Sequence, residues 1–83
     1  MQLGERIRAL REAEGMGRHL FSEKTGINKV TLEKIETGRS LKFAATELEK
    51  VGIAFPNWAG FLLTGNENEE IKKILDNNKD YRK

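Results

Sequence analysis

Lysine and arginine side chains that could bind phosphate groups are concentrated in the middle of this 83-residue sequence. The net charge is only +2, and from Val51 onward five basic residues balance five acidic ones. Between Gly15 and Lys42, by contrast, three acidic residues accompany six basic ones, namely Arg18, Lys24, Lys29, Lys34, Arg39 and Lys42. Such a local excess of positive charge is typical of a surface that contacts the phosphates of a nucleic acid.

A valine lies among these cations on a predicted helix. Asn28 is a good N-cap for a helix that reaches about Thr37, and Gly38 should end it. With about 100° between successive residues, the core side carries Asn28, Leu32 and Ile35, and the outward side carries Lys29, Val30, Glu33, Lys34 and Thr37. Single exposed apolar residues are common. In these surroundings, however, a valine suits the DNA major groove, where it can touch a thymine methyl group. Beside it, Lys can bond guanine, and Thr31 or Thr37 can bond phosphate or base edges.

Catalytic and metal-binding chemistry has little support in the sequence. There are no cysteines and His19 is the single histidine, so neither a thiolate nor a histidine-based metal site is available. Ser22 and Ser40 are not spaced to form a nucleophile–base arrangement with His19. We therefore expect no catalytic residue, no metal and no cofactor, and not an enzyme. The charged N-terminal residues and the lack of a long apolar stretch predict a soluble, cytoplasmic protein with no membrane partner.

The elements that must position these side chains are predicted to be helices. Apolar residues recur with helical spacing along the whole chain, which indicates an all-α bundle of about five to six short helices. We expect them at about residues 3–15, 18–25, 28–37, 41–52 and 56–65, with a sixth after Asn66 or Asn68. Gly26 is the expected C-terminal cap of the second helix, whose Leu20 and Phe21 should face inward.

From Leu3 to about Val51 the sequence resembles the lambda-repressor-like, Cro/XRE family of helix-turn-helix proteins. The resemblance rests on "GERIRALRE", the Gly26–Ile27 turn, "TLEKIE" and "GRS", which fall in register with the family pattern, and it is weaker at "FLLTGN". It implies a DNA-binding domain over residues 1–65, with the helix-turn-helix at about residues 17–37. Residues 66–83 would then form a C-terminal helix and tail that extend the same domain.

In that family the helix that begins near Asn28 reads the bases and the preceding helix crosses the DNA backbone. The positions that match the family's base-facing sites are Lys29, Val30, Glu33 and Lys34. The expected backbone contacts are Arg18, His19, Lys24, Thr31, Arg39 and Lys42. The resemblance also implies a structural ion pair between Arg11 and Glu36, which would tie the first helix to the recognition helix.

The sequence departs from the family pattern in two places. Gly17 and Arg18 stand where family members usually have Ser or Thr followed by Gln. A guanidinium at this position suits phosphate or guanine, whereas an amide could pair with adenine. After Gly52 the chain is several residues longer than the usual connection to "LLTG", so dimer geometry cannot be carried over from the family.

One recognition helix reads only a few base pairs, so we expect a homodimer on an inverted repeat of double-stranded DNA. The electrically balanced C-terminal third offers Trp58, Phe61, Leu62, Ile71, Ile74 and Leu75 as the dimer contact. Alternatively, the apolar stripe of the last helix docks onto its own domain. The expected function is that of a transcriptional regulator that acts as a repressor. The alternative is an antitoxin that binds a toxin partner and regulates its own genes, and a restriction–modification controller fits the same features.

Overall fold

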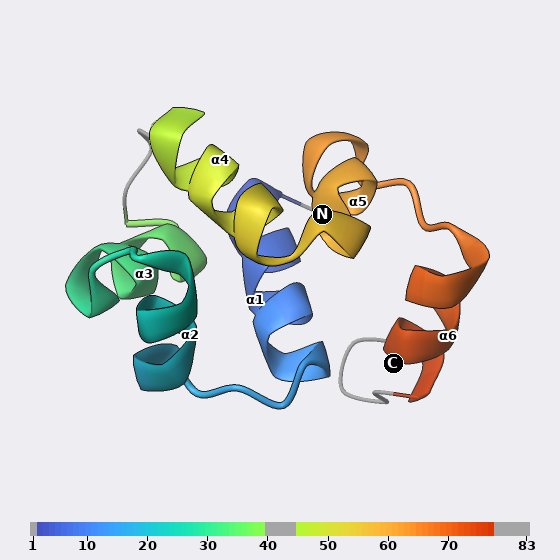
Figure 1. Cartoon of the computed structure of the whole chain (residues 1–83), viewed down its shortest axis with the longest axis horizontal. Helices are drawn as coiled ribbons and strands as arrows, with labels where there is room; N and C mark the ends of the chain where they lie inside the picture. The colour runs from blue at the N-terminus through green and yellow to red at the C-terminus, as the bar shows by residue number, and fades with distance from the viewer. Residues whose placement is uncertain (1, 40–44, 78–83) are drawn as a thin grey trace.

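The structure is a computed structural model that describes residues 2–39 and 45–77. Its helices are α1 (Leu3–Ala13), α2 (Arg18–Thr25), α3 (Lys29–Glu36), α4 (Ala45–Ala54), α5 (Ala59–Thr64) and α6 (Glu69–Asn77), with a 3₁₀ turn, η1 (Pro56–Trp58), before α5. Figure 1 shows α1 near the centre, with α2 and α3 on one side and α5 and α6 on the other. No strand occurs within the described ranges, which confirms the all-α prediction.

The helix ends follow the local signals of the sequence. Gly26 (φ 78°) and Gly65 (φ 77°) take up the left-handed conformation that ends α2 and α5. The Asn28 side chain caps α3 by accepting a hydrogen bond of 2.8 Å from the Val30 amide. Asn68, rather than Asn66, caps α6, because its Oδ1 accepts a hydrogen bond of 2.8 Å from the Ile71 amide. These ends are therefore set by residues close in the chain.

Three details differ from the sequence-based expectation. The fourth helix runs two residues past Gly52, because the chain continues as a regular turn in which the Phe55 amide donates to the Val51 carbonyl. The predicted start of this helix, at residues 41–44, lies outside the described residues. The fifth helix begins as the 3₁₀ turn η1. Leu20 is 42% exposed and not inward, since the narrow contact face of α2 already carries Phe21 and, one turn later, Thr25.

The hydrophobic core joins the helix-turn-helix to the C-terminal helices. Ile7, Ala9 and Leu10 of α1 are completely buried, and α1 contacts α3, α5 and α6. Phe21 of α2 stacks on Phe55, with the ring centroids 5.3 Å apart. Because α1 is covered from both sides, its position is fixed and it can hold α3 in a defined orientation.

The side chains expected to form a dimer contact lie in this core instead. Trp58, Phe61, Leu62, Ile71 and Leu75 are at most 3% exposed, and Ile74 is partly buried against them. The Trp58 indole donates a 3.1 Å hydrogen bond to Glu14 at the end of α1. A small domain needs such apolar faces to cover its own core. In this structure the apolar stripe of α6 packs on its own domain, which is the alternative to a dimer contact, and no second copy is present to test that contact.

Candidate nucleic-acid interface

The turn between α2 and α3 is closed by side-chain hydroxyl groups. Ser22 Oγ donates to the Ile27 carbonyl. Thr25 Oγ1 donates to the Phe21 carbonyl (2.8 Å) and accepts from the Ile27 amide (3.2 Å). Together with the left-handed Gly26 and the buried Ile27, these bonds hold the two helices in one arrangement. These contacts fix the position of α2 relative to α3 in this structure, so that the two helices form one joint surface.

The outward face of α3 carries the residues expected to read bases. Leu32 and Ile35 are buried in the core, whereas Val30 is 59% exposed and Lys29 and Lys34 are also exposed. Thr31 and Glu33 are half-buried beside them. Asn28, which the helical wheel placed on the core side, is exposed, because it precedes the first helical turn and acts as its cap. The result is an open helix face with two cations around a valine.

The other residues expected to contact DNA lie around this face. Some are exposed without an ion pair among the described residues, and others already pair with a carboxylate. Lys24 is exposed on α2. His19 is also exposed there, and its Nε2 lies 3.1 Å from a carboxylate oxygen of Glu23. Arg39 is exposed after α3, and its Nη2 donates to a Glu33 carboxylate oxygen at 3.4 Å. Arg39 thus pairs with one of the expected base-reading residues. Lys42 lies outside the described residues.

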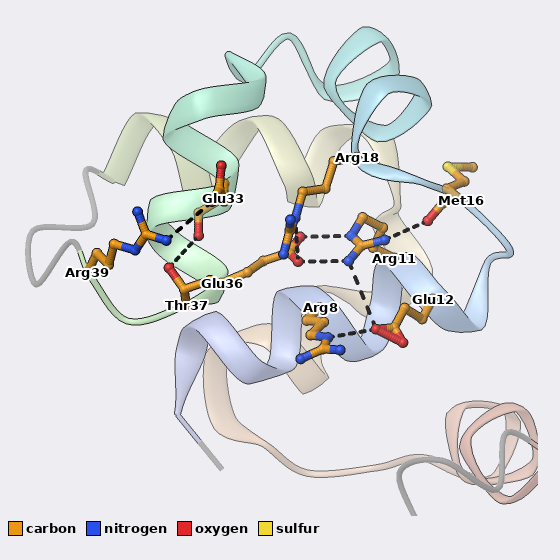
Figure 2. A network of polar contacts seen from close by, with 9 residues as sticks. All are labelled: Arg8, Arg11, Glu12, Met16, Arg18, Glu33, Glu36, Thr37 and Arg39. Carbon is orange, nitrogen blue, oxygen red and sulfur yellow. Dashed lines mark hydrogen bonds and ion pairs between the residues drawn. The ribbon is translucent and has the colours of Figure 1, made fainter.

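A buried ion pair connects α3 to α1 (Figure 2). Arg11 Nε and Nη2 donate to the two carboxylate oxygens of Glu36, each at 2.8 Å. The Glu36 side chain is completely buried, and Arg11 Nη1 also donates to the Met16 carbonyl at 2.8 Å. Two parallel bonds fix both the distance and the rotation between the groups. This pair therefore sets the position of the C-terminal end of α3 relative to α1.

Arg18 joins the same carboxylate, which sequence reasoning did not foresee. Its Nε donates to Glu36 at 3.2 Å, and its side chain remains 32% exposed. Within the part of the chain that the structure describes, the two terminal nitrogens of Arg18 have no hydrogen-bond partner. The only sequence signal was the unusual Arg at the start of the second helix. Glu36 thus orients Arg18 while leaving its outer donors available.

The charge balance around Glu36 favours an anion on the outer side. In the connected network, two carboxylates, those of Glu12 and Glu36, pair with three guanidinium groups, those of Arg8, Arg11 and Arg18. Arginine stays protonated in proteins, so this group carries an excess of one positive charge. The excess lies on α2, next to the exposed cations of α3. A phosphate that approaches the α2–α3 surface would therefore meet Arg18, which Glu36 holds in place, and the exposed lysines of α3.

Two short helices at the surface, joined by a glycine turn and backed by a third helix, define a helix-turn-helix protein. A family model described as a helix-turn-helix domain matches residues 2–50, so the chain belongs to the helix-turn-helix domain family. Neither the curated proteins nor the solved structures searched returned a match. The helix-turn-helix is a DNA-binding fold, and DNA is the partner that this family membership supports.

Two further kinds of site can be examined among the described residues, a metal site and a membrane-spanning helix. Residues 2–39 and 45–77 contain no group of three His, Cys, Asp or Glu side chains that could hold a metal ion. Within the same ranges, no helix has the length and apolar character needed to cross a membrane. The helix-turn-helix family is typically non-enzymatic. The chemistry that the site itself offers is the binding of phosphates and base edges.

Proposed function

We propose that this protein is a sequence-specific regulator of transcription, acting as a repressor of the lambda-repressor-like, Cro/XRE type. The observation that carries the proposal is the outward face of α3, where Lys29, Val30 and Lys34 are exposed while Leu32 and Ile35 anchor the helix in the core. A helix presented in this way can enter the major groove without disturbing the fold.

In the proposed complex the residues divide into two groups by what they contact. Lys29 and Lys34 bond guanine acceptors, and Val30 packs against a thymine methyl group. Glu33 accepts from cytosine, once it is released from Arg39. The DNA backbone is held by Arg18, His19, Lys24, Thr31, Arg39 and Lys42. Backbone contacts fix the register of α3, so that the base contacts can select the sequence.

The proposed regulator binds an inverted repeat as a homodimer. A single helix-turn-helix buries a small interface and distinguishes few base pairs, whereas two copies on adjacent half-sites double the sequence that is read. A repressor needs no further activity, since occupation of the operator is enough to exclude other proteins from it. The buried ion pair between Arg11 and Glu36 supports this function by keeping α3 in one orientation.

The test is selection of bound duplexes from random sequence, followed by affinity measurements on the selected site. We expect a motif with twofold symmetry. Lys34→Ala should weaken binding by about 1–3 kcal/mol and relax the preference at one base pair of each half-site. Lys73→Ala is the control, because Lys73 is an exposed lysine of α6 outside the proposed interface. Binding without any selected motif would contradict the proposal, as would equal losses for the two variants.

A further inference from the structure

The chain turns back immediately after α3 and brings Arg39 beside Glu33. The Thr37 amide and its Oγ1 both donate to the Glu33 carbonyl, at 3.0 and 2.8 Å, which closes the last turn of the helix. Gly38 then takes up the left-handed conformation (φ 75°) that reverses the direction of the chain. Arg39 Nη2 donates to a carboxylate oxygen of Glu33 at 3.4 Å, as Figure 2 shows. The backbone therefore places a cation beside a carboxylate that is expected to read bases.

The pair between Arg39 and Glu33 is exposed and weak. Its side chains are 67% and 43% exposed, and its distance of 3.4 Å is longer than the 2.8 Å bonds between Arg11 and Glu36. Water screens the attraction between exposed charges, so such a pair stabilises a protein little. The two groups can therefore separate at small cost when each of them finds a better partner.

DNA offers each of the two groups a different partner. A guanidinium forms strong, paired hydrogen bonds with any phosphate, so the partner available to Arg39 does not depend on the sequence. The Glu33 carboxylate needs a donor, and cytosine presents its amino group in the major groove, whereas guanine and thymine present acceptor oxygens there. A carboxylate that faces these oxygens keeps its negative charge uncompensated. Where cytosine is absent, Glu33 is therefore more stable in its pair with Arg39.

We propose that Arg39 and Glu33 form an exchange pair, in which the base that Glu33 meets decides whether Arg39 binds the DNA backbone. On a site with cytosine, the carboxylate accepts from the base and Arg39 moves to a phosphate. On a site with guanine or thymine at that position, the pair stays closed and Arg39 makes no phosphate contact. One base change thus removes two contacts, which makes the pair a determinant of specificity. This inference rests on the proposed DNA-binding function, because both of the exchanged partners belong to DNA.

The test measures the salt dependence of binding for Arg39→Ala on two inverted repeats. One carries the selected motif, and the other has the cytosine that Glu33 meets replaced by guanine in both half-sites. Glu33→Ala identifies this position, because it should abolish the preference for cytosine there. Arg39→Ala should reduce the log–log salt slope by about 0.9 for each half-site on the selected motif and leave the slope unchanged on the altered one. Lys24→Ala, which removes an exposed cation of α2, is the control and should reduce the slope on both.

A second background tests the role of Glu33 directly. Glu33→Ala removes the carboxylate that holds Arg39, so adding Arg39→Ala to it should reduce the slope on both sites. Glu70→Ala removes the same charge from an exposed position of α6, and in that background Arg39→Ala should still act on the selected motif alone.

Three results would overturn the exchange while the proposed function stands, because a selected motif remains in each. Equal reductions by Arg39→Ala on the two sites would show a fixed phosphate contact. No reduction on either site would show a pair that never opens. A Glu33→Ala variant that keeps every base preference would show that the carboxylate reads no base. Binding without any selected motif would instead refute the proposed function itself, and the exchange with it.

Discussion

At the scale of single residues, Glu36 is the side chain on which the most contacts converge. Its carboxylate is completely buried and receives hydrogen bonds from Arg11 and Arg18. A buried charge costs several kcal/mol in lost hydration unless well-oriented partners replace the water. Arg11 supplies two such bonds and is itself 8% exposed. The pair thus gives little net stability, and its main effect is to fix the geometry between α1 and α3.

The first prediction compares two arginines of α1. Arg11→Ala should reduce the free energy of unfolding by about 3 kcal/mol, the lower end of the cost of breaking a buried pair, because Arg18 still contacts Glu36. Arg8→Ala should cost about 0.5 kcal/mol or less, since Arg8 pairs with Glu12 at an exposed helix position. Urea denaturation measures both values. Equal losses for the two variants would contradict the structural role of the pair.

The second prediction concerns Arg18, which is held through Nε and has free terminal nitrogens among the described contacts. Arg18→Ala should cost only about 1 kcal/mol of stability, because Glu36 keeps both bonds from Arg11. DNA affinity should fall for all sequences alike, and the log–log salt slope should decrease by about 0.9. A titration at several salt concentrations measures both.

Arg18→Lys is the control for the Arg18 prediction. A single ammonium group cannot bond Glu36 through one nitrogen and a phosphate through two others, as a guanidinium can. We therefore expect the lysine to recover only part of the lost affinity. Full recovery would show that charge alone matters at this position and that the orientation by Glu36 does not.

At the scale of elements, the decisive feature is the close approach of α1 to the end of α3. A Cβ atom added to Gly4 would overlap the Ile35 carbonyl oxygen. Backbone atoms cannot move aside as a flexible side chain can, so only glycine lets the two helices lie at this distance. The contact between Gly4 and Ile35 lies near the C-terminal end of α3, one helical turn after the buried Leu32. Gly4 therefore contributes to the placement of the recognition helix.

The third prediction follows from this contact. Gly4→Ala should lower the free energy of unfolding by about 1–3 kcal/mol, because α1 and α3 must separate to admit the methyl group. Gly60→Ala is the matched control, since Gly60 is the second residue of α5 as Gly4 is of α1, and nothing lies near its added Cβ. That change should raise stability by up to about 1 kcal/mol. Thermal melts distinguish the two, and destabilisation by both would rule out a contact-specific cause.

At the scale of the whole molecule, α6 belongs to the same hydrophobic core as the helix-turn-helix. Ile71 and Leu75 are buried in one cluster with Ile7, Leu10 and Trp58, and α6 contacts α1. Chains of this size have little apolar area to spare, so each helix that covers the core contributes to the stability of the whole. α6 therefore supports the proposed DNA-binding surface indirectly, through its contact with α1.

The fourth prediction tests this coupling. Leu75→Ala should destabilise the domain by about 2–4 kcal/mol, because Leu75 is 2% exposed. Far-ultraviolet circular dichroism and the fluorescence of Trp58, the single tryptophan, should report the same unfolding midpoint. Lys73→Ala, an exposed change on the same helix, should leave the midpoint nearly unchanged. Two separate transitions in Leu75→Ala would show that α6 unfolds independently of the rest.

The sequence by itself determined the helices and the face of α3 that is exposed. Asn28 and Gly26 act on neighbouring backbone groups, and the spacing of Leu32 and Ile35 places Val30 outward whatever lies elsewhere in the chain. These are short-range effects of hydrogen bonding and helix period. For the same reason the helix-turn-helix could be predicted from its own residues. The sequence did not predict the end of the fourth helix beyond Gly52 or the exposure of Leu20 and Asn28.

Only the tertiary structure decided which apolar side chains are buried and which remain free. Trp58 and Leu75 were candidates for a dimer contact on their spacing, yet they fill the core, while Ile53 and Leu63 are exposed. The period of a helix identifies an apolar face but not the surface that covers it, which depends on residues distant in the chain. The attachment of Arg18 to Glu36 likewise required α1, α2 and α3 to meet around one carboxylate.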